Sequence, residues 1–264
     1  MSRLIKASTS QGHQDLVPDG NPYTNFLRFG LVQLESGTAH SGIADGVETL
    51  AVILTGTVSI SVGDQTWDDL GGRTSVFDGS PTSVYIPLGA EYTFIASSNA
   101  EIALCSSVTD ETFEAYVITP DEVQVSNRGD RNWKRTIRDI VTTSGDGRVS
   151  RLVAGETINA PGDWSSYPPH KHDGEFAPEE PNFEEVYHYR VDPAEGYGVQ
   201  LHYTSDKSID DAYTVYNGDT FVIEQGYHPM VAAGGHSLYY LWFMAGDTGR
   251  TLNPYIEPAF RWLL

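Results

Sequence analysis

Six of the eight histidines follow residue 169, and their spacing is the feature of this sequence most able to do chemistry. The sharpest cluster is Pro-Pro-His-Lys-His-Asp at 168–173, which separates His170 and His172 by one residue. Because alternate side chains of a β-strand share a face, both imidazoles can point at one centre. This pair predicts a metal site.

A carboxylate and a third imidazole can complete the ligand set. Glu185 opens the strand-like run Glu-Val-Tyr-His-Tyr, and Glu184 beside it is the alternative. His228 follows a Gly-Tyr turn at the end of a strand, and His236, after two glycines, is the competing imidazole. Three imidazoles and one carboxylate suit one divalent transition metal per chain (Zn, Mn, Fe, Co or Ni), with positions open for substrate.

Short β-rich runs predict the strands that must position these residues. Glycines such as Gly56 and the pair Gly71-Gly72 punctuate the runs at hairpin spacing. We expect an all-β fold with strands near 25–34, 50–62, 83–86, 92–96, 102–107, 151–158, 185–191, 198–204, 213–216, 220–224 and 238–244.

A polar segment at 127–133, Asn-Arg-Gly-Asp-Arg-Asn-Trp, interrupts the strand pattern. A chain of 264 residues can bury two cores of medium size. The pattern therefore predicts an N-terminal domain over 1–130 and a C-terminal domain over 131–264, related by duplication.

The net charge of −20 restricts the partners. Such a field repels nucleic acid and anionic membranes, so neither is expected, and an anionic substrate would require local positive charge at its site. No stretch of about 18 apolar residues predicts a membrane span. The single Cys105 excludes an intramolecular disulfide and favours a reducing compartment, so we expect a cytoplasmic protein.

The histidine cluster resembles the first motif of the cupin superfamily, in which a glycine precedes His-x-His and a glutamate follows. Here Gly162 leads to His170 and His172. Twelve residues separate His172 from Glu185, more than in the general motif, so the acidic loop 174–184 looks like an insertion. The resemblance implies two tandem cupin barrels, each a double-stranded β-helix or jelly roll.

The second cupin motif is recognisable over 218–228, with Glu224 where proline is usual and His228 one residue early. His236 after two glycines is more typical of a turn. In the first half, 86–92 resembles the same motif with Tyr92 in place of the histidine. The resemblance therefore implies an N-terminal barrel without metal ligands, serving as a scaffold or dimerisation barrel.

Longer stretches resemble the 5-deoxyglucuronate isomerase family of inositol catabolism. They are Tyr-Pro-Pro-His-Lys-His-Asp, Glu-Glu-Val-Tyr, Gly-Tyr-His-Pro and Tyr-Tyr-Leu-Trp-Phe-Met-Ala-Gly, all within 167–246, together with 73–77 and 83–87. In the related uronate isomerases the ligand strand begins with a glutamate, which favours Glu185 over Glu184. The resemblance implies an aldose–ketose type isomerase, an intramolecular oxidoreductase that converts 5-deoxy-glucuronate to 5-dehydro-2-deoxy-gluconate through a metal-stabilised enediolate.

Strand alternation predicts the substrate contacts. Tyr187 shares a face with Glu185 and is the first candidate, with Tyr203 the second, whereas His188, Arg190 and Lys171 should point away from the site. The partner is a small-molecule uronate, and the acid or base that moves the proton is left unassigned.

Three other functions remain open. A 5-dehydro-4-deoxyuronate ketol-isomerase differs only in its substrate. A cupin dioxygenase would require iron and consume O2. A non-catalytic sugar-binding cupin would bind without turnover, and a homodimer is one candidate assembly for any of them.

Overall fold

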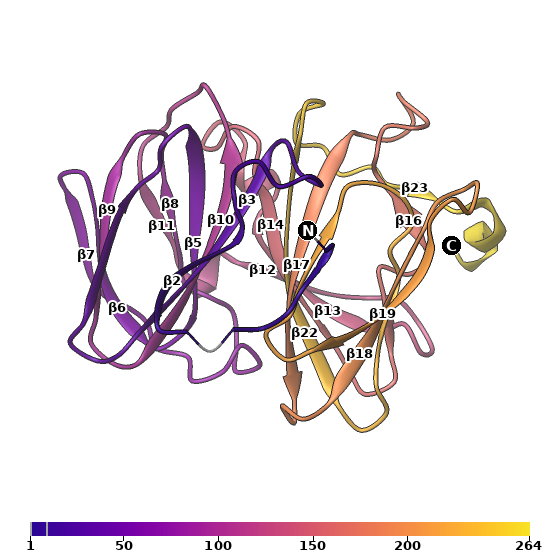
Figure 1. The fold of residues 1–264 in the computed structure, drawn as a ribbon, viewed down its shortest axis with the longest axis horizontal. Coiled ribbons are helices and arrows are strands. Elements are labelled where there is room, and N and C mark those ends of the chain that lie inside the picture. Colours follow the sequence, from indigo (N-terminus) through magenta and orange to yellow (C-terminus); the bar gives the residue numbers. More distant parts are fainter. Residues whose placement is uncertain (1, 9) are drawn as a thin grey trace. The chain divides into compact units, whose positions relative to one another are not determined.

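The computed structural model describes residues 2–8 and 10–264, and almost all of its regular elements are β-strands (Figure 1). The all-β prediction is confirmed. Two compact units are present. Among the described residues, the N-terminal unit comprises 10–124 and Ile140–Val153, and the C-terminal unit comprises 2–8, Val125–Asp139 and Ala154–Leu264. No helix in the described ranges is long and apolar enough to span a membrane.

The N-terminal unit is built from two antiparallel sheets, with strand orders β11-β8-β5-β10-β3-β2 and β4-β9-β6-β7. Its elements are β2 (Gly12–Val17), β3 (Leu27–Leu34), β4 (Ala39–Ile43), β5 (Val47–Thr55), β6 (Thr57–Val62), β7 (Gln65–Gly71), β8 (Ser83–Ile86), β9 (Glu91–Ala96), β10 (Ala100–Val108), β11 (Tyr116–Ile118), and the 3-10 helices η1 (Pro120–Glu122) and η2 (Thr143–Gly145).

Apolar side chains from both sheets fill the interior of the N-terminal unit. Ile53, Ile60 and Phe94 are completely buried there, and Tyr92, which stands where a cupin would have its histidine ligand, packs into the same core. This burial follows from the strand alternation, because each strand directs every second side chain inward.

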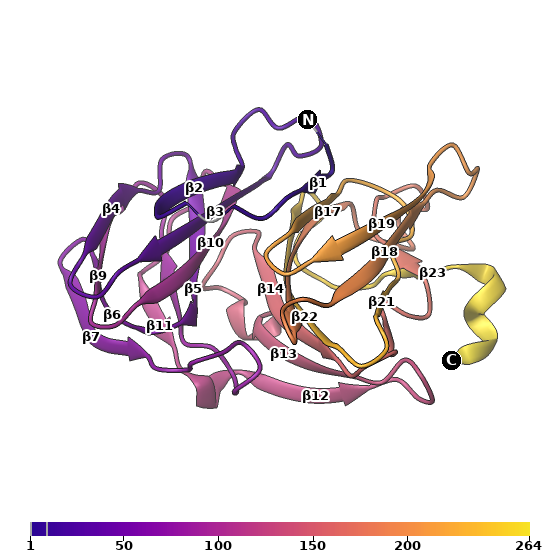
Figure 2. The same ribbon diagram turned by 60° about the horizontal axis from the view of Figure 1, so that its bottom comes forward.

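The C-terminal unit contains a large sheet of order β1-β20-β17-β22-β14-β13-β12, a four-stranded sheet β15-β21-β18-β19 and the pair β16-β23 (Figure 2). Its elements are β1 (Leu4–Ile5), β12 (Gln124–Arg128), β13 (Arg135–Val141), β14 (Val153–Asn159), β15 (Trp164–Ser165), β16 (His170–Lys171), β17 (Phe183–Asp192), β18 (Tyr197–Tyr203), β19 (Asp210–Tyr216), β20 (Thr220–Ile223), β21 (Met230–Ala232), β22 (Ser237–Gly246), β23 (Tyr255–Ile256) and η3 (Pro258–Leu263).

The register between β17 and β22 matters most for the site. Glu185 pairs with Met244 and Tyr187 with Trp242, so these four side chains share one face of the large sheet. β22 is buried along nearly its whole length, as its continuous apolar run predicts.

Two features of the chain path differ from the sequence expectation. The expected strand 50–62 is two strands, because Gly56 adopts a φ of +84° between β5 and β6. Asn127 and Arg128 belong to β12, and the rest of the polar segment joins β12 to β13 within the C-terminal unit. The chain changes unit after Ser8, Gln124, Asp139 and Val153 rather than once near residue 130. Local polarity marks a turn, whereas long-range pairing decides unit membership.

Candidate active site

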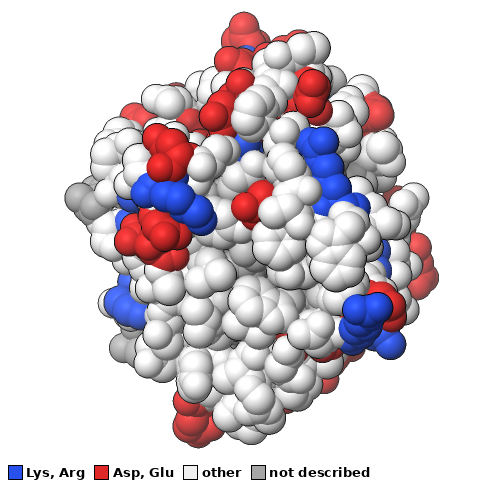
Figure 3. Space-filling view, turned by 90° about the vertical axis from the view of Figure 1, so that its right-hand side faces the viewer, with Lys and Arg blue, Asp and Glu red and all other residues white. Residues whose placement is uncertain are grey.

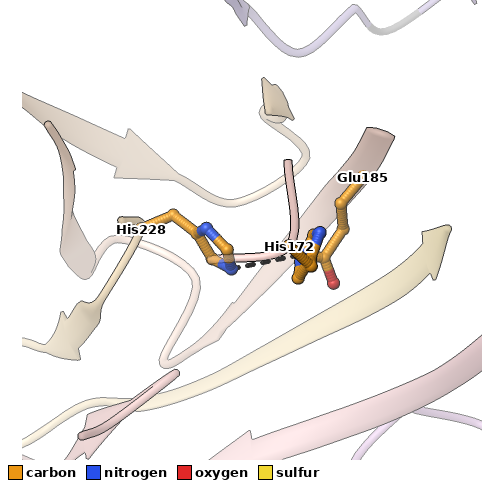
Figure 4. A group of neighbouring side chains, drawn as sticks. All are labelled: His172, Glu185 and His228. Atoms are coloured by element: carbon orange, nitrogen blue, oxygen red, sulfur yellow. Dashed lines mark hydrogen bonds and ion pairs between the residues drawn. The ribbon is translucent and has the colours of Figure 1, made fainter. Parts of the chain in front are cut away.

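Two imidazoles and a carboxylate converge inside the C-terminal unit (Figure 4). His172 Nε2 lies 3.1 Å from Glu185 Oε2, and His228 Nε2 lies 3.2 Å from the same oxygen. The ligand atoms of the three side chains all fall within 4.8 Å of one another, and all three side chains are buried. Glu185 comes from β17, His172 follows β16 and His228 precedes β21. Three segments distant in sequence thus supply one cluster.

Backbone carbonyls orient the imidazoles. The Nδ1 atoms of His170, His172 and His228 lie 3.2, 3.1 and 2.9 Å from the carbonyl oxygens of Pro168, Phe183 and Gly226. In each pair Nδ1 is the donor, so in the neutral ring the lone pair is on Nε2, the atom that can bind a metal. Such carbonyl contacts are typical of metal-ligating histidines.

His170 lies beside the three-residue cluster. Its ring centroid is 5.1 Å from that of His228 and 6.4 Å from that of His172, and it lines the same cavity. It is not part of the group whose ligand atoms all lie within 4.8 Å. The structure therefore brings together three of the four predicted ligands and places the fourth next to them.

The charges in the cluster suit metal binding. Burial alone would raise the pKa of Glu185, but His172 and His228 lower it to about 2, so the carboxylate stays ionised. Burial also favours neutral His172, yet Glu185 outweighs it and raises that pKa. For His170, burial and the neighbouring imidazoles lower the pKa to about 3, which keeps the ring neutral.

One buried nitrogen tests whether a cation fits. His228 Nε2 is shielded from solvent, and although Glu185 Oε2 lies 3.2 Å away, the atom makes no hydrogen bond of good geometry within residues 2–8 and 10–264. An orphaned polar atom of this kind is costly unless a further group satisfies it. A divalent transition ion between the imidazoles and Glu185 would do so, and the mixed nitrogen and oxygen donors suit such an ion.

The turn before His228 has a conformation that demands glycine. Gly226 adopts a φ of +82°, and an added Cβ would lie 2.6 Å from the Tyr203 carbonyl oxygen. The Gly226 amide donates to Asp173 Oδ2 over 2.7 Å. This bond ties the His228 turn to the segment that carries His172.

Lys171 anchors the segment that carries His172. Strand alternation predicts that it points away from the site; in the structure it does not line the cavity and is completely buried. Its Nζ lies 2.5 Å from Asp173, 2.6 Å from Glu180 and 3.0 Å from Glu175. Burial alone would lower the pKa of Lys171, but the three carboxylates raise it. The acidic loop is thus anchored by a buried ion network, a role that strand alternation could not predict.

A cavity of about 320 Å³ opens beside the cluster. Its size lies near the lower end of small-molecule sites. Its lining comprises Arg128, Arg135, Ile137, Thr157, Ser166, Tyr167, Pro168, His170, His172, Pro181, Phe183, Glu185, Tyr187, Tyr240, Trp242, Met244, Leu252, Asn253, Pro254, Ile256 and Leu264. On the face of the molecule in Figure 3, charged side chains surround a broad uncharged area.

The two predicted substrate contacts have different positions. Tyr187 lines the cavity, and its hydroxyl lies 2.7 Å from Ser166 Oγ. Tyr203 is not among the lining residues; its hydroxyl donates to Glu257 Oε2 over 2.6 Å. Tyr203 lies on β18, whose register with β21 and β19 directs the side chain elsewhere.

The alternative ligands lie outside the cluster. Glu184 precedes Glu185 on β17 and so projects to the opposite face of the sheet. His236 occupies the turn before β22, where its ring covers Gly196. His188 also faces away from the cavity, but it is completely buried and its Nδ1 lies 2.9 Å from Thr220 Oγ1.

Several lining residues escaped the sequence analysis. Tyr240, Trp242 and Met244 lie in the strand expected at 238–244 but were not predicted to face the site, although they alternate along β22 and two of them pair with Tyr187 and Glu185. The alternation of side chains along this strand could be predicted from the sequence, but its pairing register with β17 could not. Arg135 was hidden in the region interpreted as a crossover between domains.

Comparison with known proteins decides the family. The family model described as KduI/IolB matches residues 4–263. The chain belongs to the KduI/IolB family. The 5-deoxy-glucuronate isomerase of Bacillus subtilis strain 168 is 35% identical over 249 residues, covering 94% of this chain and 91% of its own. That of Geobacillus kaustophilus HTA426 is 35% identical over 268 residues, covering 100% and 96%.

Solved structures agree with this KduI/IolB assignment. An IolB-like protein from Salmonella typhimurium LT2 superimposes with a TM-score of 0.94 at 30% identity, covering 100% of this chain and 99% of its own. A mutant of Bacillus subtilis oxalate decarboxylase OxdC gives a TM-score of 0.65 at 13% identity, covering 96% and 77%. The latter similarity concerns the fold alone, and it confirms the predicted cupin architecture.

Proposed function

We propose that this protein is a metal-dependent isomerase that converts the aldehyde 5-deoxy-glucuronate to the ketone 5-dehydro-2-deoxy-gluconate. The observation that carries the proposal is the buried cluster of His172, Glu185 and His228, of which His172 and Glu185 line a cavity of small-molecule size. The relatives, which match over nearly the whole chain, are named 5-deoxy-glucuronate isomerase, and their name supports this choice of substrate.

His172, Glu185 and His228 would hold the metal, with His170 as the fourth ligand. When bound, a divalent ion acts as a Lewis acid that stabilises negative charge on the carbonyl and neighbouring hydroxyl oxygens. Two features suit the site to this ion. The carboxylate of Glu185 is ionised, and the imidazoles of His172 and His228 direct Nδ1 at backbone carbonyls, which leaves Nε2 as the metal-binding atom.

Tyr187 would orient the substrate. Burial raises the pKa of its hydroxyl far above the ordinary value, so the group remains protonated and can donate a hydrogen bond to a substrate oxygen. Ser166 Oγ, 2.7 Å from that hydroxyl, fixes its direction. Phe183 and Trp242 add apolar walls that limit water at the reacting carbons.

The N-terminal unit would act as a scaffold without a metal. Its interior position corresponding to a histidine ligand is taken by Tyr92, which packs with Phe94 at a ring distance of 5.1 Å. The apolar core leaves that interior to packing.

Metal content and turnover should be measured on the same preparations. We expect near-stoichiometric metal and loss of the aldehyde of 5-deoxy-glucuronate in the parent protein, and neither in the His170→Ala/His172→Ala double variant. His236→Ala is the matched control, because this histidine lies outside the cluster and should leave both readouts unchanged.

The other outcomes distinguish the remaining functions. Metal without turnover of this substrate, but with turnover of a 5-dehydro-4-deoxyuronate, would replace the substrate and keep the site. O2 consumption with an iron requirement would identify an oxygenase. Absence of metal from the parent protein after incubation with each candidate ion would overturn the proposal.

A further inference from the structure

We propose that Arg135 binds the carboxylate of the substrate, an inference that rests on the proposed function because it takes a uronate as the ligand. Arg135 opens β13 and lines the cavity. The only other Lys or Arg among the lining residues is Arg128, which is exposed, and the only acidic one is Glu185. The cavity therefore has a cationic side at Arg135 and the predicted metal ligands elsewhere on its wall.

The guanidinium of Arg135 retains most of its binding capacity. It has five N–H donors, and among the described residues its one hydrogen bond runs from Nη1 to the Trp133 carbonyl over 3.2 Å. No carboxylate lies within 4.0 Å of it in the described part of the chain. Burial is the main influence on its pKa and lowers it, so an anion at this position would compensate a partly desolvated cation.

Three other cations of the C-terminal unit are already paired. Lys171 contacts three carboxylates, Arg138 lies 3.2 Å from Glu156 and Lys6 lies 2.8 Å from Asp219. Arg135 differs from them in facing the cavity without such a partner. Guanidinium is also the group that recognises a carboxylate through two parallel hydrogen bonds.

Two aromatic rings, those of Tyr187 and Tyr240, line the same cavity as Arg135 and the predicted ligands His172 and Glu185. The ring of Tyr187 is 6.0 Å from that of His228 and 4.5 Å from that of Tyr240. Burial lowers the pKa of Arg135, whereas Tyr240 and Tyr187 raise it, so both rings lie within electrostatic reach of the guanidinium. Because His172, Glu185, both tyrosines and Arg135 line one cavity, a uronate with its carbonyl end at His172 and Glu185 can extend along Tyr187 and Tyr240 and place its carboxylate at Arg135.

The arrangement also meets the demand set by the total charge. A chain with a net charge of −20 repels anions at long range, so a uronate needs local positive charge to be retained. Arg135 supplies that charge independently of the metal.

Binding of D-glucuronate and of its uncharged methyl ester to metal-loaded protein, measured by calorimetry, tests the inference without requiring turnover. We expect Arg135→Met to weaken D-glucuronate binding about 10- to 100-fold, as for a lost charge-assisted pair, and to change ester binding little. Arg135→Lys should recover part of the affinity. Arg131→Met, at a largely exposed arginine outside the cavity, is the matched control and should behave as the parent.

The results separate this inference from the proposed function. Equal losses for acid and ester, loss of metal, or no loss at all would overturn the carboxylate site. Failure of the parent to bind D-glucuronate would overturn it too. Parent protein that binds D-glucuronate through Arg135 but converts no 5-deoxy-glucuronate would reject the isomerase reaction and retain the carboxylate site.

Discussion

The two units each bury a glutamate, and the surroundings of the two carboxylates differ. In the N-terminal unit, Glu48 accepts hydrogen bonds from the amides of Ser150, Arg151 and Leu152 at 2.6 to 2.9 Å and from the Tyr85 hydroxyl at 2.9 Å. In the C-terminal unit, the nearest ionisable neighbours of Glu185 are two imidazoles.

The difference separates a structural carboxylate from one available for chemistry. Backbone amides cannot give up their protons, so Glu48 is permanently satisfied and has no capacity for a ligand. Imidazoles can exchange a proton for a metal, and the cavity gives a substrate access to Glu185. Burial of an acid is therefore no sign of function until its donors are known.

The largest effect is expected from a change at Glu185, the carboxylate of the predicted metal site. Glu185→Gln keeps the shape but removes the charge, so we expect metal content to fall below a tenth of the parent value and turnover to fall about 1,000-fold. The thermal transition of the metal-free protein should also fall, because a pKa lowered to about 2 means that the ionised Glu185 stabilises the fold. Elemental analysis, aldehyde consumption and calorimetry of the same samples check this. Parent-like turnover would contradict the ligand assignment.

The next largest effect is expected at Lys171, a buried cation, and concerns the free energy of unfolding. Lys171→Met leaves Asp173 and Glu180 without their counter-charge, and we expect the free energy of unfolding to fall by about 3–5 kcal/mol. Denaturant unfolding measures it. Lys207 pairs with the exposed Asp210, so Lys207→Met serves as the control and should lower the free energy of unfolding by less than about 1 kcal/mol. Equal changes in the two variants would argue against the buried network.

A smaller loss is expected at the structural carboxylate. Glu48→Gln replaces one acceptor oxygen with an NH2 group, which would face N–H or O–H groups that are also donors. This mismatch should lower the free energy of unfolding by about 2–3 kcal/mol. Metal content should stay at the parent level, the opposite of Glu185→Gln. Denaturant unfolding with metal analysis checks both, and metal loss here would remove the contrast between the two units.

The smallest effect concerns pH. Glu185 raises the pKa of His172, while a metal requires the neutral ring, so metal binding must displace this proton. Metal affinity should therefore be constant above the raised pKa of His172 and fall about tenfold for each pH unit below it. Titrations of metal binding in buffers of different ionisation enthalpy would count the proton. Affinity independent of pH from 5 to 8 would contradict the coupling.

The sequence by itself determined the all-β class, most strand positions and the residue types of the site. Alternation placed Glu185 and Tyr187 on one face, and both line the cavity. The turn before His228 could be read because only glycine tolerates its backbone there. These features depend on neighbours along the chain, so local spacing encodes them.

Only the tertiary structure decided which distant side chains meet. Tyr203 and Tyr187 had similar sequence contexts, yet only Tyr187 lines the cavity. Arg135 reached the cavity because β13 joins the same sheet as β17, and Lys171 became buried because the acidic loop folds over it. Sheet order and loop closure are long-range contacts, and no period of the sequence specifies them.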